Sequence, residues 1–144
     1  MIDHRFAPYA ATILRLSLGA MWISHALLKL LVFTMPGFEG FLASQGMPVI
    51  LAWPVVLMEL AGGIAIVLGF HGRIASLALL PVIVGATVPH LPNGWVFSSN
   101  GGGWEYPVFI AAMSMVHVLL GDGAGALKPA AVLQRGRAVA GSAA

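Results

Sequence analysis

Residues 10–33 read AATILRLSLGAMWISHALLKLLVF, and this stretch decides the class of the protein. It is almost wholly apolar, and at 1.5 Å per residue it is long enough to cross a hydrocarbon core about 30 Å thick as one helix. Only three ionisable residues interrupt it, namely Arg15, His25 and Lys29. Their spacing of ten and four residues places them along one stripe of a helix. We therefore predict a membrane-spanning helix with one polar face.

The rest of the chain shares this apolar character. Of its 144 residues, 59% are hydrophobic and only 8% are charged, and the mean hydropathy is +0.93. Soluble domains average about 45–50% apolar and about 25% charged residues, and a small domain cannot bury so much apolar surface. The composition therefore excludes a soluble enzyme and a disordered chain. It predicts an integral membrane protein whose main partner is the lipid bilayer.

Charge and cysteine content narrow the chemistry. Seven basic and five acidic residues give a net charge of +2, and no basic cluster suits nucleic acid. The chain contains no cysteine, which excludes disulfides, thiolate catalysis and Cys-ligated metals or clusters. Its histidines are scattered without a close ligand spacing, so we predict no metal site. Electron chemistry would therefore require a bound cofactor or a partner subunit.

Three further apolar segments follow the first. We predict membrane spans at about 10–33, 48–69, 73–91 and 105–121, separated by turn residues such as Met35-Pro36-Gly37 and Leu91-Pro92-Asn93-Gly94. The expected fold class is all-α, an integral membrane four-helix bundle over residues 10–123. Residues 1–9 form a short segment before it, and residues 124–144 are expected to form a flexible tail.

The basic residues predict the orientation of these spans. With four spans, both termini lie on the same side as the turn at 70–73. That side carries Arg5, Arg73, Lys128, Arg135 and Arg137, whereas the loops 34–47 and 92–104 contain no Lys or Arg. Because basic residues mark the cytoplasmic side, we predict cytoplasmic termini in a multi-pass protein of the inner (plasma) membrane. Aromatic residues of the two outer loops, Trp104 among them, are expected to form an interfacial belt or else a lid over an outward-facing pocket.

Ionisable residues inside the spans are the candidate functional residues. A charge at mid-bilayer costs at least about 2.5–3.5 kcal/mol, so such groups face the helix interior and pair. Counting along each span predicts an outer polar cluster of His25, Lys29, His90 and Glu105, with Glu59 beneath it and Arg15 and His117 further inward.

These residues have a structural interpretation. Glu59 would pair with Arg15 or Lys29, unless Lys29 extends outward to the interface. Arg15 has the alternative of bonding to His117, and His117 that of a packing residue with Ser114 one turn earlier on the same face. His90 would bond to the outer loop backbone, and Glu105 would be an ordinary helix-start acid.

They also have a functional interpretation. Histidine and glutamate can donate hydrogen bonds to quinone carbonyls and carry protons. On this hypothesis Glu59 and His25 act catalytically. The cofactor-binding set is then Arg15, His25, Lys29, Glu59, His90, Trp104 and Glu105.

Several short motifs support a family resemblance. They are Arg15-Leu16-x-x-Gly19, His25-x-x-x-Lys29-Leu30, Glu59-Leu60-x-Gly62-Gly63 with Leu68-Gly69 and Arg73, Gly103-Trp104-Glu105-Tyr106-Pro107, and Gly121-Asp122-Gly123. In order and spacing, over about residues 10 to 125, this pattern resembles the DoxX family. One departure is Ala26, where the family often has glycine. The family is similar to the small DoxD-type subunit of thiosulfate:quinone oxidoreductase, which implies a quinone-associated role.

The function expected from the sequence is therefore a DoxX-type membrane subunit. It would be associated with a quinone-linked oxidoreductase complex, and any enzymatic turnover would need a redox partner. Two alternatives stay open at this stage. One is a non-catalytic assembly protein held together by its charge pairs, and the other is a small transporter built as a homo-oligomer.

Overall fold

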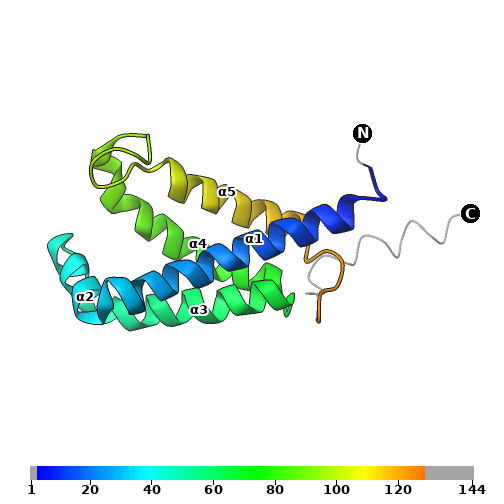
Figure 1. The fold of residues 1–144 in the computed structure, drawn as a ribbon, viewed down its shortest axis with the longest axis horizontal. Coiled ribbons are helices and arrows are strands. Elements are labelled where there is room, and N and C mark those ends of the chain that lie inside the picture. Colours follow the sequence, from blue (N-terminus) through cyan, green and yellow to red (C-terminus); the bar gives the residue numbers. More distant parts are fainter. Residues whose placement is uncertain (1–2, 129–144) are drawn as a thin grey trace, which may run out of the picture.

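The computed structural model describes residues 3–128, and its regular secondary structure is helical. The α-helices of this part of the chain are α1 (Ala7–Leu27), α2 (Thr34–Ser44), α3 (Ala52–Leu68), α4 (Gly72–Thr87) and α5 (Glu105–Leu120). Helix α1 packs mainly on α3, α3 on α4 and α4 on α5, and α5 also contacts α1 (Figure 1). The fold is therefore all-α, as predicted.

Three helical segments are long and apolar enough to cross a membrane. They are Ala7–Val32, Val49–Leu68 and Gly72–Asn93, because short π- and 3-10-helical turns lengthen α1, α3 and α4. Helix α5 is also apolar but has 16 residues, which span about 24 Å. The fourth predicted span is thus a shorter helix than a bilayer core of about 30 Å requires on its own.

The predicted turn at residues 35–37 is wrong, because these residues belong to helix α2. Thr34, with φ of 60°, breaks the chain direction after the first span, and a new helix begins there. Pro36 stands in the first turn of α2, where a missing N–H breaks no helical hydrogen bond. Phe38 and Leu42, one turn apart, are buried against Ala26, Ala52 and Val56. Burial of this apolar stripe makes a helix of a segment that its Pro and Gly mark as a turn.

We name the two ends of the molecule by what they carry. The basal end carries the start of α1, the turn between α3 and α4, and residues 121–128. The apical end carries α2 and residues 88–104 (Figure 1). The described structure therefore begins and ends at its basal end. Residues 129–144 of the predicted tail lie outside the described residues.

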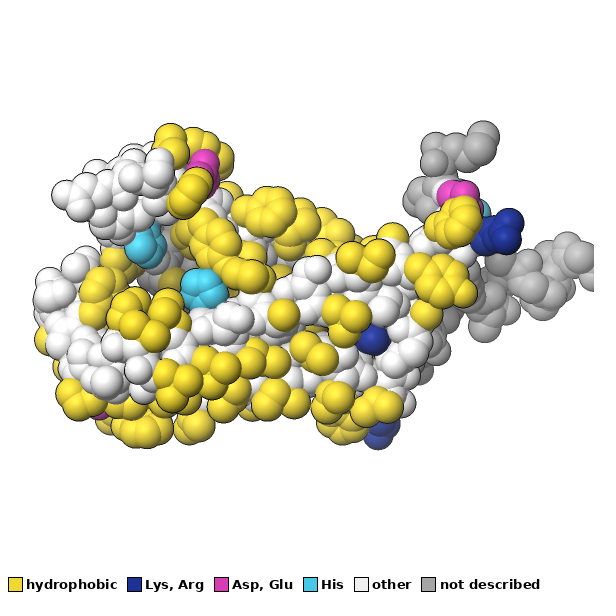
Figure 2. Space-filling model, viewed as in Figure 1, with side chains coloured by type: hydrophobic (Ala, Val, Ile, Leu, Met, Phe, Trp, Pro, Cys, Tyr) yellow, Lys and Arg dark blue, Asp and Glu magenta, His cyan; other side chains and the backbone are white. Residues whose placement is uncertain are grey.

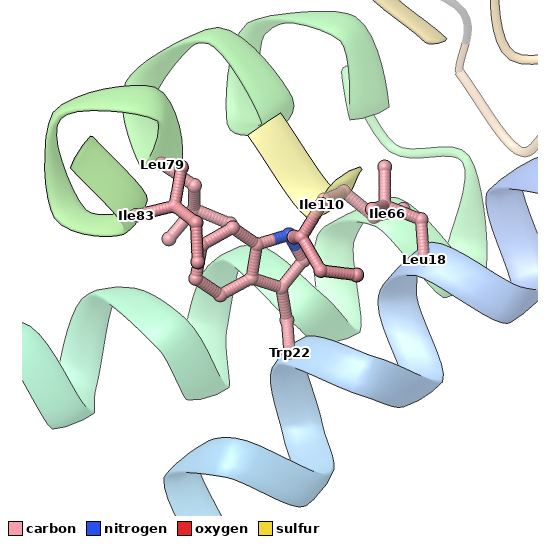
Figure 3. Packing of buried hydrophobic residues seen from close by; sticks show 6 residues of the cluster. All are labelled: Leu18, Trp22, Ile66, Leu79, Ile83 and Ile110. Carbon is pink, nitrogen blue, oxygen red and sulfur yellow. The ribbon is translucent and has the colours of Figure 1, made fainter. Parts of the chain in front are cut away.

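An apolar layer crosses the middle of the molecule. It is built around Trp22, 3% exposed, and its members come from α1, α3, α4 and α5: Leu18, Trp22, Ile66, Leu79, Ile83 and Ile110 (Figure 3). On α1, Arg15 lies basal to this layer and His25 lies apical to it. The layer thus separates two groups of polar side chains.

Two glycines bring α1 and α3 into backbone contact. A Cβ on Gly19 would lie 2.8 Å from the carbonyl oxygen of Gly63, and a Cβ on Gly63 would lie 3.0 Å from the amide nitrogen of Ile23. Small residues at such a crossing allow helices to approach closely in a membrane. This contact fixes the register of α1 on α3, and with it the side chains that can meet across the two helices.

Candidate functional site

A buried ion pair joins α1 and α3 at the apical end. Lys29 Nζ lies 2.9 Å and 2.7 Å from the two carboxylate oxygens of Glu59. Glu59 is 3% exposed, and the Lys29 ammonium also lies 5.4 Å from the ring centroid of Phe38 on α2. The π-helical turn Leu28–Val32 begins one residue before Lys29 and rotates it relative to a regular α-helix. Of the two cations proposed for Glu59, the structure selects Lys29.

His25 and Tyr106 form a second apical pair, between α1 and α5. His25 Nε2 and the Tyr106 hydroxyl share a hydrogen bond of 3.0 Å. The two rings are also stacked, with centroids 5.5 Å apart and an interplanar angle of 19°. The main-chain carbonyl of His25 lies 3.5 Å from Lys29 Nζ. His25 therefore stands between the ion pair and Tyr106.

Tyr106 also lines an apolar groove. The groove has a volume of about 490 Å³, within the usual range for small-molecule sites. Its walls come from the loop before α5 and from α5 itself: Trp95, Phe97, Glu105, Tyr106, Val108, Phe109 and Ala112. No histidine lines the groove itself, and His25 reaches it through Tyr106. Figure 2 shows histidine side chains exposed at the apical end. A flat, mostly apolar ligand with polar edges suits these walls.

The remaining apical candidates order the loop before α5. Glu105 Oε1 accepts a hydrogen bond of 2.8 Å from the amide of Phe97, in the first turn of α5. His90 Nδ1 lies 3.1 Å from the carbonyl oxygens of Gly101 and Gly102, as the structural interpretation expected. Trp104 packs edge-on against Trp95, with ring centroids 4.4 Å apart. Within the predicted outer cluster, His25 and Lys29 thus contact side chains of other helices, whereas His90 and Glu105 bond to the backbone of the loop before α5.

A second polar cluster lies basal to the apolar layer. Arg15 Nη1 donates a hydrogen bond of 2.8 Å to the carbonyl oxygen of Asp122, so Arg15 binds neither Glu59 nor His117 as its first partner. The apolar layer lies between Arg15 and Glu59, which explains why they do not pair. His117 Nδ1 and the Ser76 hydroxyl are 2.8 Å apart, and His117 Nε2 lies 3.4 Å from Asp122 Oδ1. His117 is thus a hydrogen-bonded buried residue, but through Ser76 of α4 and not through Ser114.

Sequence reasoning missed three residues that complete these clusters. Tyr106 and Asp122 stand out in the sequence only as members of the family motifs. Ser76 gave no signal beyond a hydroxyl in an apolar span. One clue was available in the sequence. A polar side chain that shares a helix face with small residues is expected to point toward a neighbouring helix. Among residues 3–128, no three His, Cys, Asp or Glu side chains gather as metal ligands.

The chain matches a known protein family. The family model described as DoxX matches residues 10–91, which is more than half of the chain. The chain belongs to the DoxX family. The matched range contains the motifs around Arg15, His25, Lys29 and Glu59, so the predicted family membership is confirmed. The motifs at 103–107 and 121–123 lie outside the matched range. Neither the curated proteins nor the solved structures give a match.

Family membership and the three long apolar helices together identify a multi-pass membrane protein. Its exposed surface agrees with this, since large apolar side chains such as Ile13, Leu57, Leu77 and Leu119 are at least 53% exposed. In water such a surface would aggregate, whereas in a bilayer it meets lipid. The protein sits in a lipid bilayer.

Proposed function

We propose that this DoxX protein is a four-span membrane subunit of a quinone-linked oxidoreductase complex and that the apical groove takes the quinone headgroup. The observation that carries the proposal is the contact of one residue, Tyr106, with both the groove and His25. The Tyr106–His25 pair lies at the wall of an aromatic groove on the surface that meets lipid. Such a site suits a redox-active ring that enters from the membrane.

The distribution of charge supports cytoplasmic termini in the inner membrane. Arg5, Arg73 and Lys128 lie at the basal end by their places in the fold, and the dark-blue side chains in Figure 2 lie toward that end. Lys29 is the apical exception, and its charge is matched by Glu59. Since basic residues stay on the cytoplasmic side, the basal end faces the cytoplasm in this proposal. The groove then opens at the outer leaflet, and α5 completes the bundle as its fourth span.

The groove residues fit a quinone by their chemistry. Trp95, Phe97 and Phe109 line the groove and supply aromatic surface for contact with a flat ring. Tyr106 can donate a hydrogen bond to a ring carbonyl, and His25 behind it can receive or return the proton. A bound quinone would supply two-electron, two-proton redox chemistry, and in this proposal a partner subunit exchanges the electrons with it. Within the chain, Tyr106 and His25 bind, orient and exchange protons, and Lys29 and Glu59 hold His25 in place.

Quinone binding is measurable through the tryptophans of the purified protein. A short-chain ubiquinone analogue is titrated into protein in lipid nanodiscs, and quenching of the total tryptophan fluorescence, to which Trp95 contributes, is followed. We expect saturable quenching, and we expect Tyr106→Phe to weaken binding about 5- to 10-fold, since it removes one hydrogen-bond donor. Trp53→Phe is the matched control, because Trp53 lies on α3 away from the groove. Quenching that rises linearly and equally in every variant would show partition into lipid and no site.

A second candidate function is that of a non-catalytic assembly subunit. The observation that favours it is that the Lys29–Glu59 pair joins two helices with both charges satisfied. Its test is the charge exchange Lys29→Glu with Glu59→Lys. Restored accumulation and complex assembly after both single variants fail would support assembly, and failure of the exchange would oppose it. Transport through one copy is less favoured, because the apolar layer around Trp22 separates the apical and basal polar groups.

A further inference from the structure

Residues 121–128 cross the basal end and contact three helices. The amide of Ala124 donates to the carbonyl of Pro8 at 3.1 Å, and the Thr12 hydroxyl donates to the carbonyl of Ala124 at 2.9 Å, so the segment holds α1. The amides of Leu127 and Lys128 each donate at 3.1 Å to the last carbonyls of α3, and Lys128 accepts from the amide that precedes α4. The segment therefore ties the basal ends of α1, α3 and α4 together.

Glycines give this segment a hinge. Gly121, Gly123 and Gly125 have φ values of +100°, +72° and +67°, in a region that other residues rarely adopt. The amide of Gly121 still donates to the carbonyl of His117 at 2.9 Å and closes the last turn of α5. The last turn of α5 is therefore closed by a bond that does not involve the residues after Gly121.

His117 lies buried directly beneath the segment. It meets Ser76 from α4 and Asp122 from the segment itself. Two cations lie near this position: Arg15 of α1 bonds to the Asp122 carbonyl, and Arg73 of α4 bonds to the carbonyls of Val118 and Leu119. Lys128, the cation of the segment itself, is exposed and lies over the Phe70 ring. The only ionisable residue of α3, Glu59, lies beyond the apolar layer.

The hydrogen bonds fit a neutral imidazole with its proton on Nε2. In that form Nδ1 accepts from the Ser76 hydroxyl, and Nε2–H faces the Asp122 carboxylate at 3.4 Å. The opposite charges of Arg15 and Asp122 then balance within the buried cluster. A second proton on His117 would leave one uncompensated positive charge in a site that water does not reach. Nδ1 would then donate to the Ser76 hydroxyl oxygen, so the penalty comes from the buried charge and not from a lost hydrogen bond.

We propose that residues 121–128 are a proton-sensitive latch, closed while His117 is neutral and released when His117 takes up a proton. Release hydrates Arg15, Asp122 and His117 and frees the basal ends of α1 and α3 from each other. This inference does not depend on quinone binding, because the apical groove lies on the other side of the apolar layer.

The absence of cysteine from the sequence makes the latch directly measurable. Spin labels are attached to Tyr9→Cys and Leu127→Cys, two positions that are 62% and 70% exposed on α1 and on the latch. Distances between the two labels are measured by pulsed electron–electron double resonance in nanodiscs between pH 8 and pH 4.5. We expect one narrow distribution at pH 8 and a second, longer and broader population at low pH that reverts on neutralisation.

Two variants locate the sensor. His117→Gln cannot take up a proton but can still accept from Ser76 and donate to Asp122, so it should stay closed across the range. His71→Asn is the matched control, since His71 contacts the latch through its backbone amide and should leave the pH response unchanged. An unresponsive parent protein, or an equal response in His117→Gln, would overturn the proposal.

A measurement on the unsubstituted protein covers the case in which His117→Gln does not fold. Hydrogen exchange of the Ala124, Leu127 and Lys128 amides is followed against pH and corrected for intrinsic rates. Loss of protection by about tenfold or more at low pH, with α5 still protected, is expected from an opening latch. Protection that stays constant with pH, or that is lost together with α5, would equally overturn it.

Discussion

Replacing Lys29 by methionine tests the buried ion pair most directly. Both oxygens of Glu59 lie within 2.9 Å of the Lys29 ammonium, and the two side chains are 4% and 14% exposed. The variant keeps the length of the side chain but leaves the carboxylate buried without its cation. Breaking a buried pair in this way costs about 3–5 kcal/mol, because the remaining charge cannot regain its hydration. We expect the free energy of unfolding to fall by that amount.

The paired control replaces both charges. Lys29→Met with Glu59→Leu fills the same volume with apolar atoms, and such replacements are often neutral or stabilising. We therefore expect the double variant to lie within about 1 kcal/mol of the parent protein, far above the single variant. The assay is reversible unfolding in mixed micelles by titration with denaturing detergent, followed by circular dichroism.

Two results would refute this reasoning. A loss below about 1 kcal/mol for Lys29→Met would mean that Lys29 reaches the interface by itself and that the pair is not buried in the membrane. A double variant as unstable as the single one would mean that the lost stability comes from packing and not from an uncompensated charge.

Two further predictions concern the helix contacts. Gly63→Ala should lower the free energy of unfolding by about 1–3 kcal/mol, because the new methyl would lie 2.9–3.0 Å from Ile23 and Trp22 atoms; Gly40→Ala, with no atom within 4 Å, is the control that should change little. Trp22→Ala should cost about 3–5 kcal/mol by emptying the centre of the apolar layer, measured by the same detergent titration, and a loss under 1 kcal/mol would contradict the packing in Figure 3.

Most helices of the fold could be predicted from the sequence for one physical reason. A chain in lipid must satisfy its backbone polar groups within each span, so apolar runs of bilayer length become helices. Residues 73–91, for example, are predicted as a span, and Gly72–Asn93 is helical. Helix α2 escaped the prediction because its turn residues, Pro36 and Gly37, matter less than the burial of Phe38 and Leu42.

The candidate site was predictable only in part. The polar positions in apolar spans stand out in the sequence, because each must find a partner. Which partner each one finds could not be predicted, since the spacing along α1 allows Glu59 to meet either Arg15 or Lys29. Tyr106 gave no distinctive signal, because interfacial tyrosines are common and only contact with His25 and the groove sets it apart.

The sequence by itself determined the membrane setting, the long apolar helices and the DoxX pattern, because these depend on composition and local spacing. The tertiary structure decided the pairing of Lys29 with Glu59 and of Arg15 with the Asp122 backbone. It did so through the contact of Gly19 with Gly63 and the π-helical turn after Leu27, which together set the height and rotation of α1 against α3. A shift by one helical turn would leave the composition and periodicity unchanged, yet it would separate every one of these pairs.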